Sequence, residues 1–264
     1  MCGIAGIVRT DGRPVDAAVL GRMAACLAHR GPDQKGLWIE DAAPGRAPAA
    51  GLAARRLAVI DRPGSRQPMT GEDGSVRLVF NGEIYNYRDL RRHLEARGHR
   101  LASAGDTETI VHLYEDHGPD LLGRLVGMFA LAVWDARRRR LLLARDRLGQ
   151  KPLYWWHGGA GLVFASEPAA LLECPDVPRR MDPPALGAML RFGYVPAPAT
   201  GFAEVRKLPP AHYLVFDAAT GRVSGPVRYW DVPRGPAEEG TPAGAWCERL
   251  EAALAEAVRS QLEA

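Results

Sequence analysis

Short apolar segments with a strong preference for β-structure recur along the chain, and they constrain its fold more than any other feature. They are rich in Val, Ile, Leu and aromatic residues, and they span residues 4–8, 57–60, 76–80, 128–134, 141–144, 153–156, 162–165 and 213–216. Most are joined by brief polar turns such as "DARRRR", "HGGAG" and "DAATG", which favour mainly antiparallel pairing. A hydrophobic content of 47% and a charged content of 25% are ordinary for a globular chain of 264 residues, so a packed core is expected.

Helical patterns alternate with these strands. Asp16 is expected to cap a first helix that ends before "HRGPD", and Asn86 is expected to cap a second helix that Gly98 closes. A third helix follows "GDTETI", where either Asp106 or Thr107 is the expected N-cap. Helices mixed with antiparallel strands indicate an α+β fold built in layers.

The C-terminal part of the chain differs in composition. Residues 233–244, "PRGPAEEGTPAG", are typical of a linker. Apolar residues then recur at helical spacing, and they are Trp246, Leu250, Leu254, Val258 and Leu262. We therefore expect one main domain over residues 2–218. Residues 219–264 are expected to form a linker and the first helix of a further domain whose remainder this chain lacks.

The charge and cysteine patterns exclude several function classes. A formal net charge of +3 is too small to indicate nucleic-acid binding, and the arginine run 137–140 lies between two predicted strands, as expected for a solvated hairpin turn. The 4 cysteines are scattered without a CxxC pair, which favours a reducing, cytoplasmic setting. No signal peptide or membrane span is predicted. The 7 histidines are dispersed without HExxH spacing, so no metal site is expected.

A cysteine stands directly behind the initiator methionine. Removal of Met1 would make Cys2 the terminal residue and place a thiol and an α-amine on one amino acid. A terminal α-amine has a pKa of about 7.7–8, so it can accept the thiol proton directly or through a water molecule. The alternative is that Cys2 is simply a small residue near the start of a strand.

Three further stretches carry residues suited to acyl chemistry, each with a plainer alternative. Asn81 and Gly82 in "FNGEIYNY" offer two N–H donors for an oxyanion hole, or they form an ordinary strand-to-helix turn. Arg55 and Arg56 enter a predicted strand, so only one of them can face a pocket and bind a carboxylate there; the alternative is a surface arginine. Asp106 can hold a ligand ammonium if its neighbour caps the helix instead.

Taken together, the motifs resemble a known family. "MCGIAGIV", "HRGPD", "RRLAVID", "QPM", "NGEIYNY", "GDTETI", "GMFALAVWD", "RDRLGQKPLY" and "SEPAALL" occur in the order and spacing of the glutaminase half of glutamine-hydrolysing asparagine synthetases, from residue 2 to about residue 230. The resemblance implies a class II glutamine amidotransferase domain of the N-terminal nucleophile hydrolase type. Its implied fold is a four-layer α-β-β-α sandwich of two mainly antiparallel sheets. "ARRLAVID" replaces the Arg-Trp-Ala-Thr-His-Gly-type stretch of the glucosamine-phosphate synthase and phosphoribosyl amidotransferase branches, which disfavours them.

The resemblance also implies catalytic roles. Cys2 matches the nucleophile and its own amine the base, while Asn81 and Gly82 match the oxyanion hole. The implied reaction is attack of Cys2 on the glutamine side-chain amide, release of ammonia, and hydrolysis of the γ-glutamyl thioester by water.

Glutamine-binding residues are implied in the same way. Arg56 matches the arginine that binds the α-carboxylate, and Ile60 matches a backbone position of that site. Asp106 matches the acid that meets the α-amino group, with Glu83 beside it. Gln150 stands where the family often has an apolar residue.

The implied whole activity needs more than this chain. In the family, ammonia passes to a synthetase domain that uses ATP and magnesium to amidate aspartate. The Ser-Gly-Gly-x-Asp-Ser loop of that domain is not found here, and no cofactor is expected within the chain itself. The alternatives are an amidotransferase for another carboxylate, such as a cell-envelope or natural-product precursor, and an inactive glutamine-binding module. Neither nucleic acid nor a membrane is an expected partner, and the sequence leaves a homodimer open.

Overall fold

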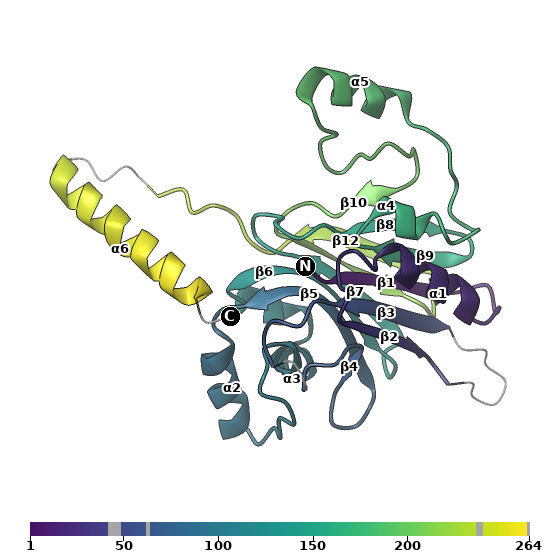
Figure 1. Cartoon of the computed structure of the whole chain (residues 1–264), viewed down its shortest axis with the longest axis horizontal. Coiled ribbons are helices and arrows are strands. Elements are labelled where there is room, and N and C mark those ends of the chain that lie inside the picture. Colours follow the sequence, from purple (N-terminus) through teal and green to yellow (C-terminus); the bar gives the residue numbers. More distant parts are fainter. Residues whose placement is uncertain (42–48, 62–63, 236–239, 263–264) are drawn as a thin grey trace.

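Two six-stranded antiparallel sheets pack face to face in the computed structural model of the chain (Figure 1). The structure describes residues 1–41, 49–61, 64–235 and 240–262. The first sheet has the strand order β10 (Arg206–Lys207), β8 (Tyr154–Gly158), β9 (Gly161–Ala165), β1 (Gly3–Arg9), β3 (Ala50–Arg56), β2 (Gln34–Ile39). The second has the order β12 (Arg222–Arg228), β11 (His212–Asp217), β7 (Arg140–Arg145), β6 (Gly127–Asp135), β5 (Val76–Ile84), β4 (Met69–Thr70).

Strand β1 shows how the layers are built. Side chains alternate along a strand, so Ile4 and Val8 enter the apolar layer between the sheets while Ala5 and Ile7 face the helices. All residues of β1 are buried, because both of its faces are covered and both of its edges are paired, with β3 and with β9. The second sheet meets this layer with large side chains such as Trp134.

Helices cover the outer face of each sheet. α1 (Ala17–Cys26) and α4 (Pro168–Leu171) pack on the first sheet. α2 (Tyr87–Ala96), α3 (Thr107–His117) and the 3-10 helix η1 (Gly118–Gly123) pack on the second. The predicted four-layer α-β-β-α sandwich of antiparallel sheets is therefore confirmed.

Two helices lie away from the layers. α5 (Pro183–Phe192) was not expected from the sequence, and it carries a left-handed Gly193 at its C-terminus. α6 (Ala243–Gln261, yellow) stands apart from the sandwich in Figure 1, and no residue of it is buried. Part of the expected linker, residues 236–239, lies outside the described residues. Within the described ranges, no helix is long and apolar enough to cross a membrane.

Several local predictions are confirmed and others are wrong. The Asp16 side chain caps α1 by accepting the N–H groups of Ala18 and Val19, as predicted. Asn86 precedes α2 but does not cap it; its amide instead bridges Arg124 and Val126. The first three residues of the arginine run 137–140 lie in the expected turn between β6 and β7, and Arg140 begins β7.

The predicted strand over 57–60 is wrong, because β3 ends at Arg56 and the next residues form a loop. The sequence also missed β2, β3 and β12. The first of these reads "QKGLWI", the second is made mostly of alanine and arginine, and the third holds a glycine and a proline. β3 lacks the Val, Ile and aromatic residues on which a strand prediction depends, and in β2 and β12 glycine, or glycine followed by proline, interrupts the apolar pattern.

A buried carboxylate organises the turn after β7. Asp146 has no exposed surface, and its two oxygens accept backbone N–H groups of Phe129, Leu148, Gln150 and Lys151 at 2.9–3.2 Å. Because three of these groups follow Asp146 in the chain and the fourth belongs to β6, one side chain holds the turn against the neighbouring strand.

We expect Asp146→Ala to lower the free energy of unfolding by about 3–5 kcal/mol, since it leaves several buried N–H donors without an acceptor. Urea denaturation measures the loss. The control is Asp73→Ala: Asp73 is exposed, accepts the Ser75 N–H at 2.7 Å and pairs with Arg137, so its loss should cost about 1 kcal/mol or less. Equal losses in the two variants would contradict the role given to Asp146.

Candidate active site

A cavity of about 150 Å³ lies where the two sheets meet near the N-terminus. Its lining includes every site residue that the sequence singled out, from four separate stretches of chain: Cys2, Arg56, Ile60, Asn81, Gly82, Glu83 and Asp106. The structure therefore brings all of the predicted site residues together. Their chemical roles remain predictions at this point.

Cys2 lies immediately before β1 and is held on several sides. Its sulfur accepts the Leu57 N–H at 3.4 Å and contacts the Leu57 carbonyl at 3.6 Å. The backbone carbonyl of Cys2 accepts a hydrogen bond from Arg30 Nε at 3.0 Å. Two residues further along the chain, Ile4 donates its backbone N–H to Ser166 Oγ at 3.0 Å. Burial raises the pKa of the Cys2 thiol, although the Leu57 backbone and the nearby terminal ammonium oppose the rise.

Met1 lines the same cavity. In the chain as it stands, the nitrogen of Cys2 belongs to the peptide bond with Met1, so the free α-amine is on Met1 and not on Cys2. A thiol with a raised pKa and no adjacent base is protonated at neutral pH and therefore a weak nucleophile.

Asn81 is the least satisfied polar residue of the cavity. It is 1% exposed, yet neither its Nδ2 nor its Oδ1 has a hydrogen-bond partner among the described residues. Each buried polar group without a hydrogen-bond partner lowers the free energy of unfolding by roughly 1–3 kcal/mol. An unsatisfied amide that lines a cavity is therefore suited to bind a ligand there.

Gly82 follows Asn81 within β5, which continues to Ile84, so the alternative of an ordinary turn at this dipeptide is wrong. A Cβ on Gly82 would lie 2.1 Å from the Met128 carbonyl oxygen on the paired strand β6. Only glycine fits there. Gly82 therefore lines the cavity with backbone alone, and the strand can lie this close to β6 because the residue has no side chain.

Arg56 is the last residue of β3 and is nearly buried. Its Nη2 donates to the carbonyls of Ile60 at 2.7 Å and Asp61 at 2.9 Å, and its Nη1 donates to Gln34 Oε1 at 3.1 Å. Arg55 is not among the lining residues, which confirms that only one of the two arginines faces the pocket. The arginines end a strand rather than begin one, and Arg56 folds the following loop onto the cavity.

Asp106 precedes α3, but its side chain does not cap the helix. It accepts the Ile84 N–H at 3.0 Å and the Thr107 hydroxyl at 3.2 Å, so the expectation that Thr107 caps the helix is also wrong. Burial raises the pKa of Asp106 to about 6, with the charge of Glu83 adding to the rise and the two hydrogen bonds opposing it. The carboxyl group is thus available to the cavity and is held in an unfavourable, dry environment.

Sequence reasoning missed one charged residue of the cavity. Lys151 lines it, and burial lowers the pKa of its ammonium. Its backbone is fixed by Asp146, and it lies in the stretch "RDRLGQKPLY", which the sequence marked only as part of the resemblance. Gln67 also lines the cavity; its side chain accepts the Phe80 N–H at 2.7 Å and so supports β5.

Comparison with known sequences gives a consistent family. The profile of a glutamine amidotransferase domain matches residues 1–230. Asparagine synthetase [glutamine-hydrolyzing] 3 of Bacillus subtilis is 38% identical over 236 residues, which are 88% of this chain and 37% of that protein. A putative asparagine synthetase of Mycobacterium tuberculosis H37Rv is 38% identical over 79% of this chain and 34% of that protein. The chain thus spans about a third of the length of these relatives.

Comparison with solved structures gives the fold. Glutamine phosphoribosylpyrophosphate amidotransferase from Bacillus subtilis has a TM-score of 0.57 at 20% identity, over 82% of this chain and 47% of that one. The structure described as the allosteric regulatory enzyme of purine biosynthesis has a TM-score of 0.56 over the same shares. The fold is therefore the N-terminal nucleophile hydrolase type expected from the sequence.

The raised pKa of Asp106 predicts a pH dependence of stability. The folded state keeps a proton that the unfolded chain releases at lower pH, so the free energy of unfolding should fall as pH rises from about 4 to about 6. The fall attributable to this group is on the order of 2–3 kcal/mol. Asp106→Asn cannot titrate, so its stability relative to wild type should increase across that window in urea denaturation. Parallel pH profiles for the two proteins would contradict the raised pKa.

Proposed function

The chain belongs to the class II glutamine amidotransferase family, and we propose that Cys2 is the nucleophile with which it hydrolyses the side-chain amide of glutamine. The observation that carries this assignment is the buried amide of Asn81, whose two polar atoms lack partners in the same cavity that Cys2 lines. An acyl intermediate formed at Cys2 would supply the missing partner. No other cavity-lining residue combines these properties within the described part of the chain.

Activation begins with removal of Met1. The new α-amine of Cys2 has a pKa of about 7.7–8 and takes the thiol proton, directly or through a water molecule. This removes the obstacle described above, because the base then belongs to the same residue as the thiol. The small residue Cys2 at the second position is compatible with loss of the methionine.

The chemistry then runs in two halves. Sγ forms a bond to the amide carbon, and the carbonyl oxygen becomes an oxyanion that the Asn81 amide and the Gly82 N–H stabilise. The carbon–nitrogen bond breaks, and the leaving nitrogen takes the proton held by the α-amine and departs as ammonia. Water attacks the thioester through a second oxyanion, which regenerates the thiol and releases glutamate.

The remaining residues orient the substrate. Arg56 binds the α-carboxylate beside the loop that its own guanidinium fixes through Ile60. Asp106 binds the α-ammonium, with Glu83 adding negative charge at the same end of the cavity. In this proposal Arg56 and Asp106 bind the two charged groups of the amino acid, and the side-chain amide reaches Cys2. The reaction needs no cofactor.

We extend the proposal to the reaction that uses the ammonia released from glutamine. Since the relatives are named glutamine-hydrolysing asparagine synthetases, we infer that the ammonia is used by a synthetase domain for the ATP- and magnesium-dependent amidation of aspartate. In this proposal residues 2–218 form the glutaminase domain, and residues 219–264 lead into the synthetase part. The cytoplasm is the proposed compartment, where the thiols, all of them free in the structure, stay reduced. An amidotransferase for another carboxylate is the alternative.

Cys2→Ala is expected to abolish glutamate formation from glutamine while the folded structure remains. An electrophilic glutamine analogue should modify the wild-type chain once, at Cys2, even though Cys247 is more exposed. Mass spectrometry of peptides locates the label, and intact mass should show that active protein lacks Met1. Labelling at Cys247, or full activity in protein that retains Met1, would contradict the mechanism.

Arg56→Ala and Asn81→Ala should act on different kinetic constants. Arg56 contacts a carboxylate that does not change during the reaction, so its loss should mainly raise KM. Asn81 meets charge that develops only in the intermediate, so its loss should lower kcat by about 10²–10³.

Arg55→Ala is the matched control and should leave both constants close to those of the wild type. Thermal denaturation of each variant separates a loss of binding from a disturbed loop, because Arg56 also holds the residues after β3. An Asn81→Ala variant with a raised KM and unchanged kcat would overturn the oxyanion role.

A further inference from the structure

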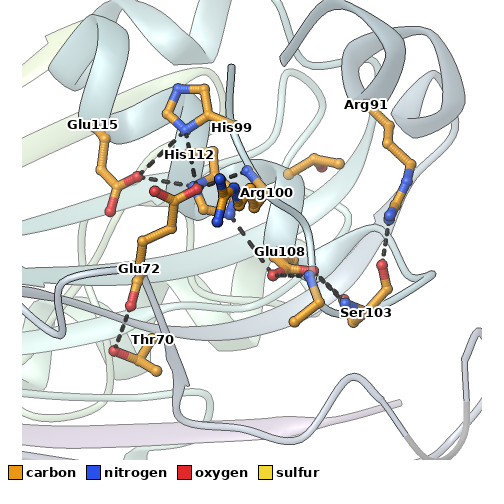
Figure 2. A network of polar contacts seen from close by, with 12 residues as sticks. Thr70, Glu72, Arg91, His99, Arg100, Ser103, Glu108, His112 and Glu115 are labelled. Carbon is orange, nitrogen blue, oxygen red and sulfur yellow. Dashed lines mark hydrogen bonds and ion pairs between the residues drawn. The ribbon is translucent and has the colours of Figure 1, made fainter. Parts of the chain in front are cut away.

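A second cluster of chemically active side chains lies along α3, outside the cavity (Figure 2). His112 and Glu115 come from α3 itself, His99 from the segment after α2, and Glu72 from the turn between β4 and β5. One donor atom each of Glu72, His99 and His112 can be chosen so that all three lie within 4.8 Å of one another. None of these residues takes part in the reaction proposed above.

The ring nitrogens and carboxylate oxygens of the cluster converge. His99 Nδ1 lies 3.9 Å from Glu72 Oε1 and 3.9 Å from Glu115 Oε2, and His112 Nδ1 lies 2.9 Å from that same Glu115 oxygen. Donors on a tetrahedral zinc ion with bonds of about 2.0–2.1 Å are roughly 3.4 Å apart. Reaching that spacing needs a relative shift of about 0.5 Å between His99 Nδ1 and either glutamate oxygen, and of up to about 1.4 Å between the most widely separated donor atoms of the cluster. The half-exposed Glu72 side chain is free to make part of this movement.

His99 has the outer hydrogen-bond partner that a metal ligand normally has, whereas His112 has a carboxylate nearby that lies beyond hydrogen-bond distance. The far nitrogen of His99, Nε2, lies 3.2 Å from Asp116 Oδ1, and the far nitrogen of His112 lies 3.7 Å from Glu108 Oε1. A carboxylate behind the imidazole fixes the tautomer and the ring orientation and raises the basicity of the nitrogen that binds the ion. Both rings thus direct Nδ1 inward and Nε2 toward an acid.

The outer carboxylates are themselves fixed. Glu108 accepts the N–H groups of Ala102 and Ser103 at 2.8 and 2.6 Å, and the Ser103 hydroxyl at 2.6 Å. Asp116 pairs with Arg97 at 2.7 Å. The two rings consequently face the same space from a preformed support, which a chance meeting of surface groups would lack.

The electrostatic field at the cluster favours a cation. Two carboxylates lie within 4 Å of the buried His112 ring: Glu115 Oε2 is 2.9 Å from Nδ1, and Glu108 Oε1 is 3.7 Å from Nε2. Glu72 Oε1 lies 3.9 Å from Nδ1 of the neighbouring His99 ring. The negative charges of these groups favour a cation among them. The donor set of imidazole nitrogens and carboxylates suits zinc, whereas calcium and magnesium prefer oxygen alone.

We propose that His99, His112, Glu72 and Glu115 bind one zinc ion that joins the β4–β5 turn and the segment after α2 to helix α3. The site is structural, because the ion would tie three segments together outside the cavity. The alternative is an ion-pair network in which the histidines carry protons and no metal binds.

The test measures zinc binding by the full chain after treatment with a chelator and dialysis. We expect one zinc ion per chain, a rise in Tm of about 5 °C or more at a hundredfold excess over Kd, and a visible cobalt(II) spectrum of four-coordinate type. His99→Gln and Glu72→Gln should remove all three signals, and both side chains are accessible enough for the variants to fold.

His93→Gln, which alters an exposed histidine of α2, is the matched control and should keep every signal. Loss of zinc only from His99→Gln and Glu72→Gln, with glutamine hydrolysis retained, supports the site independently of the proposed function. Three outcomes would overturn it: no binding by the wild-type chain, equal binding by His99→Gln, or a cobalt–thiolate absorption band that places the metal on a cysteine.

Discussion

The burial of β1 on both faces and along both edges is the constraint on which the site depends. A residue next to a chain terminus normally frays, since few contacts hold it. Here the strand that follows Cys2 lies between β3 and β9, and Ser166 and Arg30 bind the backbone on either side of its first residue. The position of the proposed nucleophile is thus fixed by the core of the first sheet rather than by a loop.

The cavity also depends on the contact between the two sheets. Cys2 and Arg56 belong to strands of the first sheet or adjoin them, whereas Asn81 and Gly82 belong to β5 of the second. Their relative positions are therefore set by the apolar layer between the sheets, to which Ile4 and Trp134 both contribute. A change in that layer would alter the distance between nucleophile and N–H donors without touching any lining residue, and such distances affect rates steeply.

The sequence predicted the residues of the cavity well but the local structure around them less well. Cys2, Asn81 and Asp106 could be assigned because each sits in a dense motif, and the resemblance supplied their common purpose. The end of β3 could not be predicted, because alanine and arginine have little preference for strands. The apolar residues "LAVI" that follow have the composition of a strand but form a loop. The need for glycine at position 82 could not be predicted, because it comes from the close approach of β6, which exists only in the folded structure.

The histidine cluster was missed for a different reason: Glu72, His99 and His112 are far apart in the chain, and only folding brings them together.

The buried carboxyl of Asp106 has a consequence for selectivity. An ammonium group arriving in the cavity would return the pKa of that carboxyl toward its ordinary value and so recover the free energy that burial withholds from the empty protein. A ligand of the same shape without an amino group would gain nothing of this kind. Discrimination between amino acids and simple amides would then arise from the protonation state of one residue, even where the fit of the two ligands is the same.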